Sequence, residues 1–117
     1  MERNFVRVAG ASEIPVGSMK KVNYEGVDVL IVNVNGHYYA LRDNCPLLGG
    51  DFSEGTLNGE IIACQQHRAK FNVTTGKFAS NVRFPSLHPK VPDVETYDVL
   101  VENGEIMIKP LTHEHAR

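Results

Sequence analysis

Residues 27–41 of this 117-residue chain read VDVLIVNVNGHYYAL and decide its fold class. The first eight residues are largely β-branched and apolar, and a second extended run begins at His37. Asn35 and Gly36 lie between the two runs, and both tolerate the positive φ that a tight type I′ turn requires. The stretch therefore predicts two antiparallel strands joined by a two-residue hairpin turn.

The Asn–Gly pair recurs outward from this hairpin, at Asn58-Gly59 and at Asn103-Gly104. Each pair adjoins a short apolar run, so each predicts a further hairpin. Other strands are expected from apolar or alternating runs at residues 5–8, 19–24, 60–64, 70–73, 97–101 and 105–108. A single helical turn fits residues 11–17, and no stretch has the 3.6-residue period of an amphipathic helix. An all-β meander or small barrel is expected.

Composition narrows the class of protein further. A mass of 13.0 kDa suits one domain. The formal net charge is −2, which argues against a nucleic-acid partner because such domains need a basic face. No apolar run approaches the ~20 residues that span a bilayer, and the first residues lack the apolar stretch of a signal peptide. We therefore expect a cytoplasmic protein without a membrane anchor, in which the two cysteines are thiols or metal ligands.

Both cysteines lie next to hairpin signals, in segments that look like loops. Cys45 belongs to the glycine-rich stretch 42–55, RDNCPLLGGDFSEG, and Cys64 begins the motif Cys-Gln-Gln-His that ends at His67. A C-x-x-H turn lets a thiolate and an imidazole point into one space. Glycines in the first loop have no Cβ, so the backbone can approach a bulky group closely. A metal centre is expected here, although buried inert thiols fit the same pattern.

These motifs, taken together, resemble Rieske-type [2Fe–2S] ferredoxins over residues 5 to 108. The residues that carry the resemblance are Cys45-Pro46-x-Leu48-Gly49-Gly50, Gly55-x-Leu57, Cys64-x-x-His67-x-Ala69-x-Phe71 and Thr75-Gly76, followed by a proline loop. The resemblance implies an antiparallel β sandwich or barrel with a small cluster-binding subdomain at one tip. It places the domain at residues 1–110, the subdomain at about 42–92 and a polar tail at 111–117.

The resemblance also implies a ligand set. Cys45 and Cys64 would hold the inner iron of a [2Fe–2S] cluster, and His67 would hold the outer iron. The residues expected to line the cofactor pocket are Leu47, Leu48, Gly49, Gly50, Ala69 and Pro85. Leu47 departs from the family, because it stands where a second histidine ligand is expected and has no lone pair to offer.

Four outcomes remain open at the sequence level. The cluster can assemble on three protein ligands, with water, hydroxide or a nearby side chain such as His88 as the fourth. The pocket can be empty, in a cluster-less subunit or interaction module. The three residues can hold one ion, since two cysteines, one histidine and an open position form a known type of site. Lastly, the chain can be a ligand-deletion variant of an ordinary ferredoxin.

The function implied by the resemblance is one-electron transfer between protein partners, namely a reductase and an oxygenase or respiratory acceptor. A low reduction potential is expected, because Ala69 and Phe71 replace the hydroxyl residues that bond to sulfur in high-potential members. The sequence contains none of the common nucleophile, phosphate-loop or dinucleotide motifs. We therefore expect a carrier and not an enzyme.

Overall fold

The computed structural model describes residues 5–45, 50–64, 69–79 and 93–110, and within these ranges the chain is all-β, as expected. The strands are β1 (Val6–Gly10), β2 (Met19–Tyr24), β3 (Val27–Val34), β4 (His37–Arg42), β5 (Thr56–Asn58), β6 (Ile61–Ala63), β7 (Lys70–Asn72), β8 (Thr96–Glu102) and β9 (Glu105–Pro110). Two short 3-10 helices are also present, η1 (Ala11–Glu13) and η2 (Phe52–Glu54). No helix in the described ranges is both long and apolar enough to cross a lipid bilayer.

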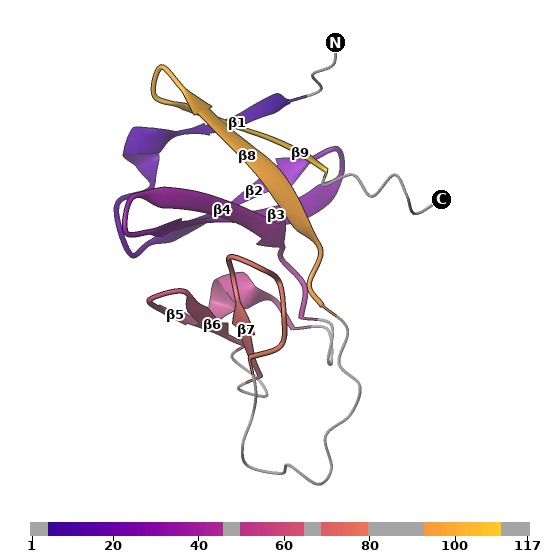
Figure 1. The fold of residues 1–117 in the computed structure, drawn as a ribbon. Coiled ribbons are helices and arrows are strands. Elements are labelled where there is room, and N and C mark those ends of the chain that lie inside the picture. Colours follow the sequence, from indigo (N-terminus) through magenta and orange to yellow (C-terminus); the bar gives the residue numbers. More distant parts are fainter. Residues whose placement is uncertain (1–4, 46–49, 65–68, 80–92, 111–117) are drawn as a thin grey trace, which may run out of the picture.

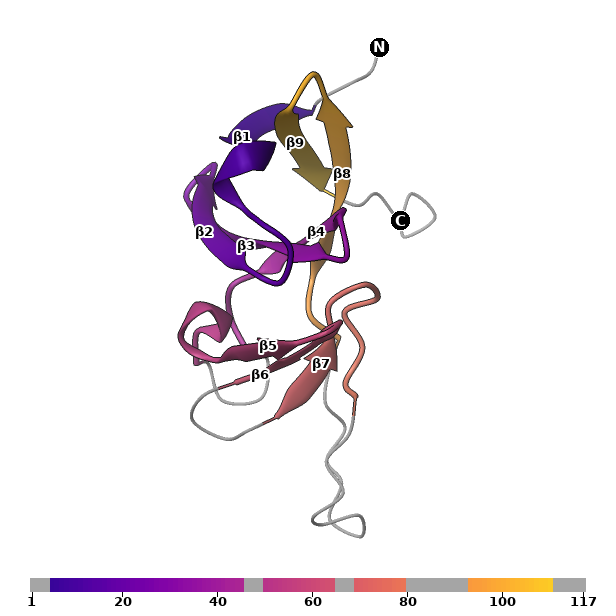
Figure 2. The ribbon, with the colours of Figure 1, turned by 90° about the vertical axis from the view of Figure 1, so that its left-hand side faces the viewer.

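Six of the strands form one antiparallel sheet in the order β1-β9-β8-β4-β3-β2. Seen end-on, this sheet curls into an almost closed barrel in which β1 and β2 approach each other (Figure 2). The pairing of β1 with β9 slips by one residue between Arg7 and Ala9, which is a β-bulge that increases local twist. The described part of the chain therefore confirms the small antiparallel barrel expected from the sequence.

A separate three-stranded sheet, in the order β5-β6-β7, lies beside one end of the barrel (Figure 1). Strand β3 contributes side chains to two buried clusters, one on each of its faces. Its Val29 and Ile31 belong to the cluster within the barrel, whereas Leu30 and Val32 belong to a second cluster that includes residues of the small sheet. Because successive side chains of a strand point to opposite faces, both faces of β3 are buried. This burial accounts for its uninterrupted apolar run.

The hairpin turns follow the sequence at two of the three predicted places. Asn35 and Asn103 have φ of 53°, and the glycine after each is also positive, as a type I′ turn requires. The prediction at Asn58-Gly59 was wrong by one residue. Asn58 pairs with Ile61 as the last residue of β5, so the turn consists of Gly59 and Glu60.

An additional hairpin turn joins β2 to β3 at Glu25-Gly26, where φ is 49° and 87°. The sequence did not suggest it, because glutamate seldom adopts a positive φ. Helix η2 was likewise not expected. After β7 the chain turns, and Phe78 returns to form an isolated bridge with Phe71.

Candidate metal centre

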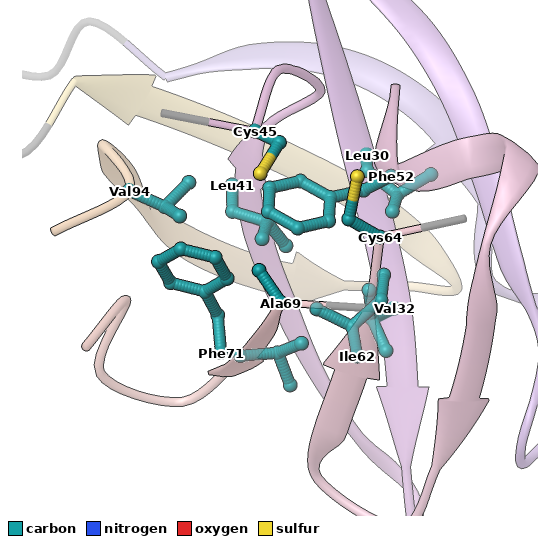
Figure 3. Packing of buried hydrophobic residues seen from close by; sticks show 11 residues of the cluster. Leu30, Val32, Leu41, Cys45, Phe52, Ile62, Cys64, Ala69, Phe71 and Val94 are labelled. Atoms are coloured by element: carbon teal, nitrogen blue, oxygen red, sulfur yellow. The ribbon is translucent and has the colours of Figure 1, made fainter. Parts of the chain in front are cut away.

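Cys45 and Cys64 lie in the same buried cluster, although they are distant in the sequence and belong to different loops. Each side chain is only 1% exposed, and both belong to the cluster between the barrel and the small sheet. Figure 3 shows the two sulfur atoms beside the Phe52 ring, with Ile62, Ala69 and Phe71 in the same cluster. The structure therefore places both thiols in one buried cluster, and their role as metal ligands stays a prediction.

The two cysteine loops are closed in the same way. The Cys45 N–H donates to the Gly50 carbonyl oxygen at 2.7 Å, and the Cys64 N–H donates to the Ala69 carbonyl oxygen at 2.9 Å. In both cases the cysteine bonds to the residue five positions later, so each loop begins and ends at a fixed point. The loop ends that carry the two sulfurs are therefore held by matched backbone hydrogen bonds.

Aromatic side chains from the elements that follow the two cysteine loops pack in the cluster. Phe52 and Phe71 are fully buried and meet edge to face, with ring centroids 5.4 Å apart. Phe78 meets Phe71 in the same manner at 5.5 Å. Burial of these rings keeps water away from the thiols, and a low dielectric strengthens electrostatic effects on any centre bound there.

Two of the other predicted site residues lie within the described part of the chain. Gly50 and Ala69 lie at the closing points of the two loops, and Ala69 is 2% exposed. Leu47, Leu48, Gly49, His67 and Pro85 lie outside the described residues, as does His88. Within the described ranges no three His, Cys, Asp or Glu side chains gather closely enough to hold a metal ion. His67, the third ligand expected from the sequence, lies outside these ranges.

The sulfur atoms of Cys45 and Cys64 suit one of the two irons of the expected [2Fe–2S] centre. Two buried sulfurs from separate loops form a soft donor pair of the kind that binds iron in iron–sulfur clusters or zinc. Figure 3 shows both sulfur atoms near the Phe52 ring, on the same side of the cluster. The chemistry of this donor pair therefore fits the inner iron of a [2Fe–2S] centre, which binds cysteine thiolates.

The structure adds one polar residue that the sequence did not single out. Asp43, two residues before Cys45, is 4% exposed, and its Oδ1 accepts a hydrogen bond from the Ser53 N–H at 2.8 Å. The sequence gives no signal for this, since an acid in a glycine-rich stretch usually faces solvent. Phe52 was also not singled out, although it contacts the cluster that contains both cysteines.

A small β barrel with a second sheet and two matched cysteine loops is consistent with an iron–sulfur domain of the Rieske class. The chain belongs to the family of Rieske [2Fe-2S] domains, whose sequence model matches residues 4–98. The family and the fold expected from the sequence are thus both confirmed.

Individual relatives agree with this assignment over nearly their whole length. The chain is 31% identical over 109 residues to the ferredoxin component of the naphthalene 1,2-dioxygenase/salicylate 5-hydroxylase systems of a Ralstonia species, covering 93% of this chain and 98% of the relative. It is 32% identical to the ferredoxin CarAc of Metapseudomonas resinovorans, covering 92% and 95%. Both relatives are ferredoxins.

A solved structure shows the same fold together with a partner. It is a complex of reduced oxygenase and oxidized ferredoxin in carbazole 1,9a-dioxygenase, and the matched chain is 29% identical with a TM-score of 0.81. The match covers 96% of this chain and all of the other. In that complex the ferredoxin has an oxygenase as its redox partner, which is one of the partner kinds expected from the sequence.

Proposed function

We propose that this chain is the ferredoxin of a dioxygenase system and carries single electrons from a reductase to a terminal oxygenase. Support comes from the relatives, which are named as ferredoxin components, and from the near-complete coverage of their length. The complex of an oxygenase with a similar ferredoxin supports the kind of partner. Transient docking of this type needs only a small surface patch.

The observation that carries the proposal is the pair of buried sulfurs at the closed ends of two matched loops. In the proposed site Cys45 and Cys64 hold the inner iron of a [2Fe–2S] cluster, and His67 holds the outer iron. The cluster supplies a centre that accepts and releases one electron. The residues around it have supporting roles: Phe52 and Phe71 exclude water, and the backbone at Gly50 and Ala69 holds the loop ends.

Leu47 makes the proposed site unusual, because it cannot be the second histidine ligand. We propose that a cluster still assembles on three protein ligands, with the fourth position filled by a group other than residue 47. Leu47, Leu48, Gly49 and Pro85 then act as pocket residues that shield the centre. The proposed cluster-binding part spans about residues 42–92, and a cytoplasmic location remains a prediction.

Iron and labile sulfide measured after anaerobic purification and reconstitution test the proposal. Two irons and two sulfides per chain are expected, and Cys45→Ala and Cys64→Ala should each abolish them. Val73→Ala is the matched control, because Val73 is equally buried in the same cluster and offers no ligand. Leu47→His should keep the cluster and change its visible and electron paramagnetic resonance spectra towards those of a two-histidine centre.

Two results would contradict the proposal and favour the alternatives. A colourless protein that takes up neither iron nor sulfide would identify a cluster-less Rieske-fold module. One metal ion per chain without sulfide, lost in the Cys64→Ala variant, would identify a mononuclear site.

A further inference from the structure

We infer that Asp43 is a positioning residue for the first cysteine loop, and that its buried charge lowers the reduction potential of a centre bound by Cys45 and Cys64. Asp43 follows the last residue of β4 and lies two residues before Cys45. Its side chain is completely buried, which is rare for an aspartate unless a specific partner is present.

The geometry shows how Asp43 holds the loop. Its N–H donates to the Asp28 carbonyl oxygen at 2.9 Å, which anchors the residue beside β3. Its Oδ1 accepts the Ser53 N–H at 2.8 Å, so the carboxylate spans the loop from its start to helix η2. Phe52, the neighbour of Ser53, is fully buried in the cluster that contains both cysteines. Asp43 therefore fixes both ends of the segment that carries Cys45.

The environment of the second carboxylate oxygen suggests a role for the charge of Asp43 beyond its hydrogen bond to Ser53. Asp43 Oδ2 is buried and accepts no hydrogen bond from the described residues. Lys21 Nζ is its cation, at 3.9 Å, and the Lys21 side chain is 40% exposed. A buried charge with such incomplete compensation costs stability, and a neutral amide would supply the same acceptor to Ser53 without that cost. The charge itself therefore requires an explanation.

Asp43 lies close to Cys45, and this proximity suggests an effect on the reduction potential. Two trans peptide units separate Asp43 from Cys45, so their Cα atoms lie within about 7.6 Å. Cys45 and the carboxylate are both buried, where charges are weakly screened. A fixed negative charge there disfavours the addition of an electron to a nearby centre. It acts in the same direction as the missing hydroxyl groups at Ala69 and Phe71, towards a low potential.

The positioning role is tested on the protein without its cluster, by the rate at which each cysteine is alkylated under native conditions, read by peptide mass spectrometry. Cys64 is the internal reference. Asp43→Ala should raise the rate at Cys45 at least about tenfold relative to Cys64, because a hydrogen bond to a charged group is lost. Asp43→Asn keeps the acceptor and should restore the rate. Ser53→Ala keeps the N–H donor and is the matched control. Equal acceleration at both cysteines, or no acceleration at Cys45, would overturn the positioning role.

The charge role rests on the proposed function and is tested on the holoprotein. Asp43→Asn should retain iron and sulfide while the reduction potential shifts to a more positive value. Among the described residues Lys21 is the cation that pairs with Asp43, so Lys21→Met should shift the potential to a more negative value. An unchanged potential in Asp43→Asn would overturn the charge role. A wild-type protein without cluster would instead contradict the proposed function, and the alkylation result would still decide the positioning role.

Discussion

Phe52 and Phe71 meet edge to face, with their ring centroids 5.4 Å apart and their planes at 76°. Phe52 belongs to helix η2, after the first cysteine loop, and Phe71 belongs to β7, after the second. Both rings are fully buried in the cluster that contains Cys45 and Cys64. The pair therefore links the two loops through a contact that involves neither cysteine.

This contact should contribute measurable coupling to stability. Phe52→Ala and Phe71→Ala are each expected to lower the free energy of unfolding by about 3–5 kcal/mol, because each leaves a cavity. In a double-mutant cycle followed by denaturant unfolding, the two changes should be non-additive by about 0.5–1.5 kcal/mol, the range measured for aromatic pairs. Ile106 is buried in the other cluster and supplies the control, since Phe52→Ala and Ile106→Ala should be additive. Additivity of the two phenylalanine changes would contradict the proposed link.

Gly76 fixes the return of the chain to the barrel and should tolerate no side chain. Its φ is +80°, and a Cβ there would overlap the Val94 carbonyl oxygen and lie 2.9 Å from Thr96 Cγ2. Gly76→Ala should therefore cost at least about 3 kcal/mol of unfolding free energy, through strain and overlap together. Gly104→Ala is the matched control, because Gly104 has φ +77° but open space around it. It should cost about 1–2 kcal/mol, and equal costs for the two variants would refute the close-contact argument.

Two tyrosines in the barrel predict how stability responds to alkaline pH. Tyr24 and Tyr97 meet edge to face at 5.7 Å, and burial raises the pKa of both above the ordinary value of 10.0. Glu25 raises the pKa of Tyr24 further, and Glu95 raises that of Tyr97. The folded state thus prefers neutral tyrosine, so this contribution to stability is complete below about pH 10 and is lost as pH rises through the folded-state pKa values.

Tyrosinate absorbance checks this expectation. In a pH titration, part of the tyrosinate absorbance should develop only above the pH at which free tyrosine ionises. Tyr97→Phe should reduce the absorbance change in this higher pH range. The same variant should weaken the fall in unfolding free energy above about pH 10. Titration of all tyrosines of the native protein together, at the ordinary pKa, would show that the barrel does not protect them.

The sequence predicted those parts of the fold that depend on local chemistry. The turn at Asn35-Gly36 was predicted correctly because both residues tolerate a positive φ and lie between two runs with strand propensity. The local preferences of the turn and of the strands therefore favour the same hairpin. The turn near Asn58 was displaced because the register is set by pairing of Asn58 with Ile61 in the small sheet. The turn at Glu25-Gly26 was missed because Glu25 adopts φ 49°, a conformation imposed by the paired strands.

For the candidate site, the structure places the two predicted cysteines in one buried cluster, and their ligand role stays a prediction. Cys45 and Cys64 were identified from their motifs, because thiols next to glycine-rich turns have a recognisable pattern. Asp43 was not identified, since burial of a carboxylate is a tertiary property that no local motif encodes. The role of His67 remains a prediction, as does the consequence of Leu47.

Ala69 offers a direct test of the low potential expected for this centre. Its carbonyl oxygen closes the second cysteine loop and its side chain is 2% exposed within the cysteine cluster. Ala69→Ser should move the reduction potential to a more positive value, because a hydroxyl bonded to sulfur stabilises the more negative reduced state. Ala63→Ser is the matched control, since Ala63 precedes Cys64 on β6 and is not part of the cluster. Thin-film voltammetry measures the reduction potential of the two variants. An equal shift in both, or no shift in Ala69→Ser, would show that the missing hydroxyl at residue 69 does not set the potential.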